Sequence, residues 1–127
     1  MAQEREVGSW AVEGIPNDDH LFMGIHKNLL TPDGDVPPNA FRDHGGGMST
    51  DWSKYSTPAK TRERRPKPTE NLVVQMEVGR VRGIAGQSVE HSPLLENRAH
   101  TDVLGEKDTE ARVMLRRAAA IVVPLSL

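Results

Sequence analysis

Residues 71–78, NLVVQMEV, carry the clearest strand pattern in this chain of 127 residues. The apolar positions 72, 74, 76 and 78 alternate with the polar residues Gln75 and Glu77. This period of two is typical of a strand with one buried face. After Gly79 the pattern changes phase. We therefore predict a β-bulge at this glycine, which keeps Arg80 and Arg82 out of the core.

Apolar residues are distributed unevenly around this strand. Leu, Ile, Val and Phe number 28, and 18 of them lie in residues 72–127. Residues 1–71 hold seven of the nine prolines and seven of the eleven glycines. We therefore predict a single domain over residues 1–127. Its core of sheet and helix is residues 72–127, residues 20–71 wrap this core as a loop-rich segment, and residues 1–19 form an arm.

Periodicity and capping residues predict the remaining elements. Short strands are expected at residues 20–26, 88–91, 98–104 and 121–125. A short helix is expected at residues 58–65 with Thr57 as its N-cap, and a longer helix, capped by Asp108 or Thr109, is expected to run to about residue 119. The expected fold class is therefore α+β: a small, mostly antiparallel sheet with one long C-terminal helix and a loop-rich N-terminal half.

Composition excludes several classes of protein. The absence of cysteine excludes a disulfide scaffold, a thiolate zinc site and an iron–sulfur cluster. The 16 Lys and Arg residues against 18 Asp and Glu leave a net charge of -2, so a nucleic-acid partner is not expected. No apolar run approaches the roughly 20 residues that cross a bilayer, and the polar start is unlike a secretory signal. We therefore expect a cytoplasmic bacterial protein without a membrane partner.

The first candidate site is the polar segment 91–102. In a regular strand over residues 98–104, Arg98, His100 and Asp102 share one face, with His91 and Asn97 close in sequence. An aspartate can orient an imidazole, and an arginine can hold an anion. In a catalytic interpretation, His100 is the general acid or base, Asp102 orients it, Arg98 holds the anion and His91 is a second acid–base group. An ordinary solvated sheet face produces the same pattern.

The glycine run 45–47 and the residues after it form the second candidate site. Backbone N–H groups beside the hydroxyls of Ser49 and Thr50 can hold an anion, and Trp52 can stack on a ring or anchor the loop to the core. The run does not match a P-loop, so a flexible loop is the simpler interpretation. His26, at the end of the strand 20–26, is a further candidate ligand-binding residue.

Two other patterns bear on ligands. Residues 60–67 contain five basic side chains, which can contact phosphates or an acidic partner but are also typical of a solvated surface. The five histidines could converge on a metal, yet no spacing such as H-E-x-x-H occurs. We therefore predict no metal and no cofactor.

Residues 48–58 resemble a block found in small bacterial proteins of unknown function. The shared pattern is S-x-D-W-x-K-Y, here residues 49–55, followed by Thr-Pro at residues 57–58. Later H-x-P and N-x-A-H blocks correspond to residues 91–93 and 97–100. The resemblance covers roughly residues 20–125 by the order of these blocks. Such proteins have no assigned activity, so the resemblance implies no substrate.

Two functions remain open from the sequence. The chain is either a small binding or accessory protein that presents a polar His/Arg/Asp surface to a small anion or a protein partner, or an enzyme. In the enzyme alternative it acts on a nucleotide or phosphate ester by histidine acid–base catalysis. The sequence does not determine the oligomeric state.

Overall fold

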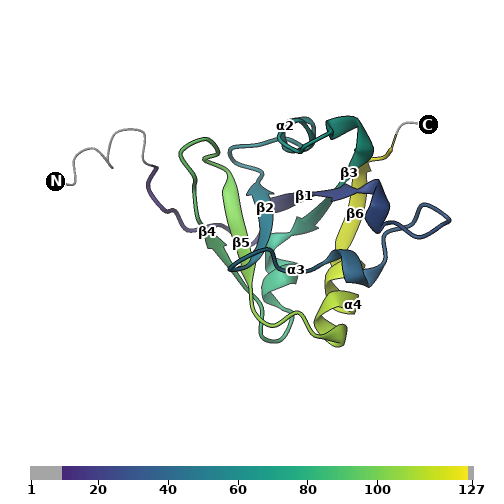
Figure 1. Ribbon diagram of the computed structural model, residues 1–127. Helices are drawn as coiled ribbons and strands as arrows, with labels where there is room; N and C mark the ends of the chain where they lie inside the picture. Colours follow the sequence, from purple (N-terminus) through teal and green to yellow (C-terminus); the bar gives the residue numbers. More distant parts are fainter. Residues whose placement is uncertain (1–9, 126–127) are drawn as a thin grey trace.

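The computed structural model describes residues 10–125, which form one six-stranded sheet (Figure 1). Every pair of neighbouring strands is antiparallel. The spatial order is β4-β5-β2-β1-β3-β6. The strands are β1 (His20–His26), β2 (Met48–Trp52), β3 (Asn71–Glu77), β4 (Ser88–His91), β5 (His100–Leu104) and β6 (Ala119–Val123).

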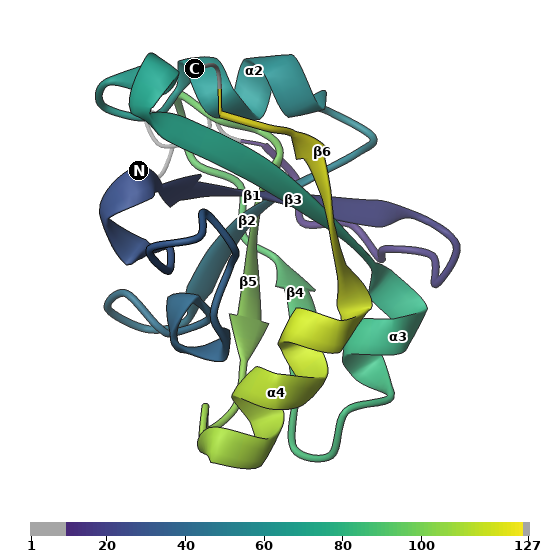
Figure 2. The same ribbon diagram turned by 90° about the vertical axis from the view of Figure 1, so that its right-hand side faces the viewer.

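Within residues 10–125, three short α-helices lie on the two faces of the sheet. Helix α2 (Pro58–Glu63) covers one face, whereas α3 (Val78–Arg82) and α4 (Thr109–Ala118) lie on the other (Figures 1 and 2). The side chains of Thr57 and Asp108 cap α2 and α4 by accepting backbone N–H groups. None of the helices within residues 10–125 has the length and apolar character needed to cross a membrane. Three 3₁₀ turns connect the strands: η1 (Lys27–Leu29), η2 (Pro38–Ala40) and η3 (Pro68–Glu70).

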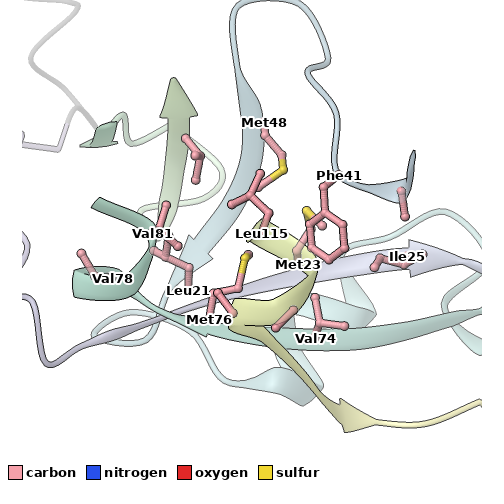
Figure 3. Close-up of a cluster of buried hydrophobic side chains, with 14 of the residues drawn as sticks. Leu21, Met23, Ile25, Phe41, Met48, Val74, Met76, Val78, Val81 and Leu115 are labelled. Carbon is pink, nitrogen blue, oxygen red and sulfur yellow. The ribbon is translucent and has the colours of Figure 1, made fainter. Parts of the chain in front are cut away.

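The hydrophobic core lies between the sheet and helix α4 (Figure 3). Alternate residues of β1 and β3 point into it, and Leu115 of α4 packs against them. Each fully buried apolar side chain contributes roughly 1.5–3 kcal/mol to the free energy of unfolding. The core residues labelled in Figure 3 are Leu21, Met23, Ile25, Phe41, Met48, Val74, Met76, Val78, Val81 and Leu115.

The predicted fold class was wrong about the long C-terminal helix and the loop-rich N-terminal half. Helix α4 has ten residues and leads directly into strand β6, so there is no long C-terminal helix. The N-terminal half is not a loop-rich wrapping, because β1 and β2 occupy the centre of the sheet. Counts of apolar residues misled the prediction, since a strand needs apolar side chains only at alternate positions. What holds is the mixed α and β character with an antiparallel sheet.

The predicted bulge at Gly79 was also wrong, because the chain turns there into helix α3. Val78 and Val81 are both buried, so the change of phase is a change from the period of a strand to that of a helix. The backbone N–H groups of Val78 and Gly79 donate to the carbonyls of Asp19 and Asn17. An added Cβ at Gly79 would lie 3.1 Å from Asn17 Cβ, so this glycine permits the close approach.

Candidate functional site

A polar pocket of about 170 Å³ opens on the sheet face that α2 covers. The strand register brings its floor together, because Asp51 on β2 lies opposite Phe22 on β1 and His100 on β5. Directly paired residues on neighbouring strands project from the same face. The volume is below the 300–1,000 Å³ typical of pockets for drug-sized ligands. The pocket therefore suits a small group rather than a large molecule.

Asp51 accepts hydrogen bonds from several of the residues that form the walls of this pocket. Its residue is 6% exposed, and its Oδ2 accepts hydrogen bonds from Thr61 Oγ1 at 2.7 Å and Arg64 Nη1 at 2.6 Å. The other oxygen, Oδ1, accepts from Asn97 Nδ2 at 2.8 Å. Arg64 Nη1 also donates to Ser56 Oγ at 3.0 Å. The carboxylate therefore joins strand β2 to the end of α2 and to the turn before β5.

Arg65 lies across strand β1 at Gly24. A Cβ added at Gly24 would be 2.8 Å from Arg65 Cδ and 2.9 Å from Cγ, so a side chain there would displace the arginine. Arg65 Nε donates to Asn71 Oδ1 at 3.1 Å, and this amide is fully buried. Within residues 10–125, neither terminal nitrogen of Arg65 has a hydrogen-bond partner. The guanidinium is thus positioned by the fold, with two nitrogens left for a ligand.

His100 is held in one tautomer at the rim of the pocket. Its Nδ1 lies 2.9 Å from the backbone oxygen of Ser92, which can only accept, so Nδ1 carries the proton. Nε2 is therefore an acceptor, and it lies 3.3 Å from Ser49 Oγ. Ser92 Oγ donates to Asp102 Oδ2 at 2.8 Å, and Asp102 Oδ1 lies 3.9 Å from His100 Nε2.

The structure does not bring Arg98 to this group. Strand β5 begins at His100, so Arg98 precedes the strand and its side chain takes a different direction from the predicted one. Its guanidinium lies over the rings of Trp10 and Tyr55, with centroid distances of 4.7 and 4.1 Å, and 3.6 Å from Glu13 Oε2. The prediction placed Arg98, His100 and Asp102 on one face, but only His100 and Asp102 lie next to each other.

His91 lies on the opposite face of the sheet from His100. It is 2% exposed, its Nδ1 accepts the Glu13 backbone N–H at 3.0 Å, and its Nε2 lies 2.7 Å from the Arg98 backbone oxygen. Its ring meets Trp52 edge-on and stacks on Tyr55. Both ring nitrogens are therefore used by the backbone, and the structure does not place His91 beside the pocket as predicted.

We call Trp10, Glu13, Tyr55, His91 and Arg98 the arm cluster, because it attaches the N-terminal arm to the sheet. Glu13 Oε1 accepts from Lys54 Nζ at 2.6 Å, and Oε2 accepts from the Tyr55 hydroxyl. These two hydrogen bonds, with Lys54 the stronger influence, lower the pKa of the Glu13 carboxyl. The hydrogen bond of Lys54 to Glu13, followed by its interaction with Tyr55, raises the pKa of Lys54.

Three other predicted ligand-binding residues have structural partners. His26 Nε2 lies 2.8 Å from Glu70 Oε1, and this hydrogen bond lowers the pKa of Glu70. Thr50 borders the pocket, but its hydroxyl donates to the buried Thr101 carbonyl. Trp52 is 1% exposed and lies in the core. Of its two predicted roles, stacking on a ring or anchoring the loop to the core, the structure shows the second.

Sequence reasoning missed Asp51, Thr61, Arg64 and Arg65, whereas it did select Ser49, Thr50, Asn97 and His100. The missed signal was the basic run 60–67, which was noted as able to contact phosphates. The glycine run 45–47 does not line the pocket. No group of three or more His, Asp or Glu side chains among residues 10–125 could hold a metal ion.

Comparison with known proteins gives no match: no family model, no curated protein and no solved structure is similar to this chain. The resemblance to small bacterial proteins of unknown function therefore stays a prediction. The function is therefore inferred from the geometry of the pocket.

Proposed function

We propose that this chain is a small binding protein whose pocket holds a small anion, with a phosphate group as the best chemical match. The observation that carries the proposal is Arg65. Gly24 and Asn71 hold its side chain in place, and its two terminal nitrogens have no partner among the described residues. A planar guanidinium with two free nitrogens pairs well with phosphate or carboxylate oxygens, because both can be bound at once.

The charge balance of the pocket supports an anion. The Asp51 carboxylate is paired with Arg64, which leaves the charge of Arg65 in excess. Asn97 and Ser49 add an amide and a hydroxyl as further donors at the wall of the pocket. Inside a partly enclosed polar pocket these donors interact with an anion more strongly than they would in bulk water.

The size of the pocket selects among anionic ligands. About 170 Å³ accommodates a phosphate group, while the rest of a larger molecule would extend into solvent. A net charge of -2 on the whole chain does not favour an extended nucleic acid. The protein partner, the bacterial origin and the cytoplasmic location stay predictions.

The test is a titration with inorganic phosphate, followed by backbone NMR signals and by calorimetry. We expect shifts at Gly24, Ser49 and Asn97 in the wild type. Arg65→Ala should weaken binding roughly tenfold or more, because a hydrogen-bonded charge pair contributes about 1.5–3 kcal/mol. Gly24→Ala should also weaken binding, since it displaces Arg65 without removing any polar group.

Arg98→Ala is the matched control, because it removes a guanidinium from the arm cluster and leaves the pocket unchanged. It should bind phosphate like the wild type. The proposal is overturned if millimolar phosphate shifts no pocket signal, or if Arg65→Ala and Arg98→Ala weaken binding equally. Urea unfolding of each variant verifies that the compared proteins are folded.

A further inference from the structure

The rim of the pocket joins an exposed serine hydroxyl to an oriented histidine. Ser49 Oγ lies 3.3 Å from His100 Nε2, and Ser49 is exposed. The Ser92 carbonyl holds the proton on Nδ1, so the lone pair on Nε2 faces the hydroxyl. A nucleophile, a base within reach and a third group that orients the base are the parts needed to activate a serine.

The surroundings also stabilise the charge that such a step creates. When His100 takes the serine proton it becomes an imidazolium, and Asp102 Oδ1 at 3.9 Å from Nε2 stabilises that positive charge. Ser92 Oγ holds Asp102 in place through its hydrogen bond to Oδ2. Arg64 and Arg65 also face the pocket, and their charges would be offset by a bound anion.

The strand register shows that this contact is not a simple cross-strand pair. Ser49 lies opposite Asp102, and His100 lies opposite Asp51, so Ser49 and His100 meet along a diagonal between β2 and β5. His91 provides an internal comparison, because backbone groups occupy both of its ring nitrogens. Only His100 of these two histidines presents a ring nitrogen to an exposed hydroxyl.

We propose that Ser49 is a nucleophile with His100 as its general base, and that the chain hydrolyses a phosphate monoester through a phosphoserine. The inference rests on the proposed anion site, since Arg65 and Arg64 would hold the phosphate oxygens beside Ser49. These guanidinium groups would stabilise the charge on the phosphoryl group during its transfer. The ester's leaving group would extend through the open side of the pocket.

The chemical steps balance without any further reagent. Ser49 Oγ forms a bond to phosphorus and its proton passes to His100 Nε2, while the bond from phosphorus to the ester oxygen breaks. The departing alcohol takes the proton from His100. A water molecule then gives a proton to His100 and its oxygen attacks phosphorus. The bond to Ser49 Oγ breaks, Ser49 regains the proton, and inorganic phosphate leaves.

The first experiment tests the nucleophile alone with an uncharged fluorophosphonate, which needs no arginine to bind. Ser49 Oγ should displace fluoride, and peptide mass spectrometry should locate the adduct on Ser49. Ser49→Ala should abolish the adduct, and His100→Gln should slow labelling at least tenfold. Ser88→Ala is the matched control, because Ser88 is an exposed strand serine without a histidine partner, and it should label like the wild type.

The second experiment follows nitrophenol release from para-nitrophenyl phosphate. We expect turnover by the wild type, loss of turnover in Ser49→Ala and a strong reduction in Arg65→Ala. Absence of a Ser49 adduct, or an adduct without turnover of the phosphate ester, overturns the inference. Phosphate binding without a Ser49 adduct leaves the anion-binding proposal standing. A Ser49 adduct in a protein that fails to bind phosphate overturns the anion site, and with it the phosphoserine mechanism that rests on that site.

Discussion

The pocket and the arm cluster contain the same kinds of residues, yet they use them differently. Each has a histidine, an arginine and a carboxylate. In the arm cluster, backbone groups occupy both nitrogens of His91, and Arg98 stacks on aromatic rings. In the pocket, His100 and Arg65 keep nitrogens that no backbone group uses. The comparison teaches that the partners of the ring nitrogens, rather than the residue type, distinguish the two histidines: only His100 presents a nitrogen to an exposed hydroxyl.

The largest expected difference between the two regions is in stability. His91→Ala should lower the free energy of unfolding by about 3 kcal/mol, because it removes a buried ring from Trp52 and leaves two backbone groups without partners. His100→Ala should cost less, about 1 kcal/mol, since among residues 10–125 its ring has none of the aromatic contacts that His91 makes. Urea unfolding of both variants measures this difference, and equal losses would contradict the distinction.

A smaller effect is expected at the centre of the pocket. Asp51→Asn should lower the free energy of unfolding by about 2 kcal/mol, because one oxygen that accepts from Thr61, Arg64 or Asn97 is replaced by a donor. Glu13→Gln in the arm cluster is the matched change and should cost less, since its ion pairs are open to solvent. Thermal or urea unfolding ranks the two variants. A larger loss from Glu13→Gln would refute the central role of Asp51.

The smallest expected effect is a pH dependence of the arm. Hydrogen bonds from Lys54 and then Tyr55 hold the pKa of Glu13 below its usual value of 4.5. Docking of the arm is therefore favoured above pH 4.5, and this contribution is lost as the pH falls through the lowered pKa. We expect the NMR signal of the Trp10 indole N–H to move toward that of a free tryptophan in acid. An acid transition of the same size in Glu13→Gln would show that another group is responsible.

Local patterns predicted several elements correctly. The strand at residues 20–26 and the strand at residues 88–91 have the predicted bounds, and the last helix begins after Asp108, one of its two predicted caps. The cap at Thr57 was also predicted correctly, because a cap depends on residues within one helical turn. Such features depend on residues that are close in the sequence, so they can be predicted without knowing which distant residues they contact.

Strand β2 could not be predicted from the local pattern of apolar and polar residues. Its inward residues include Thr50, and its outward residues include Asp51, which is buried by contacts from α2 and from the turn at Asn97. A buried threonine and a buried aspartate conceal the alternation of apolar and polar residues that identifies a strand. The pattern therefore predicts a loop after the glycine run, although the segment lies at the centre of the sheet.

By itself the sequence determined the local elements, the mixed character of the fold and four of the residues that line the pocket: Ser49, Thr50, Asn97 and His100. Only the tertiary structure decided that Arg65 would lie on Gly24, that Arg98 would turn to the arm, and that Asp51 would join three segments. The physical reason is that periodicity and capping act over a few residues. Strand register and the packing of α2 depend on contacts between residues far apart in the chain, and these arise only when the whole sheet assembles.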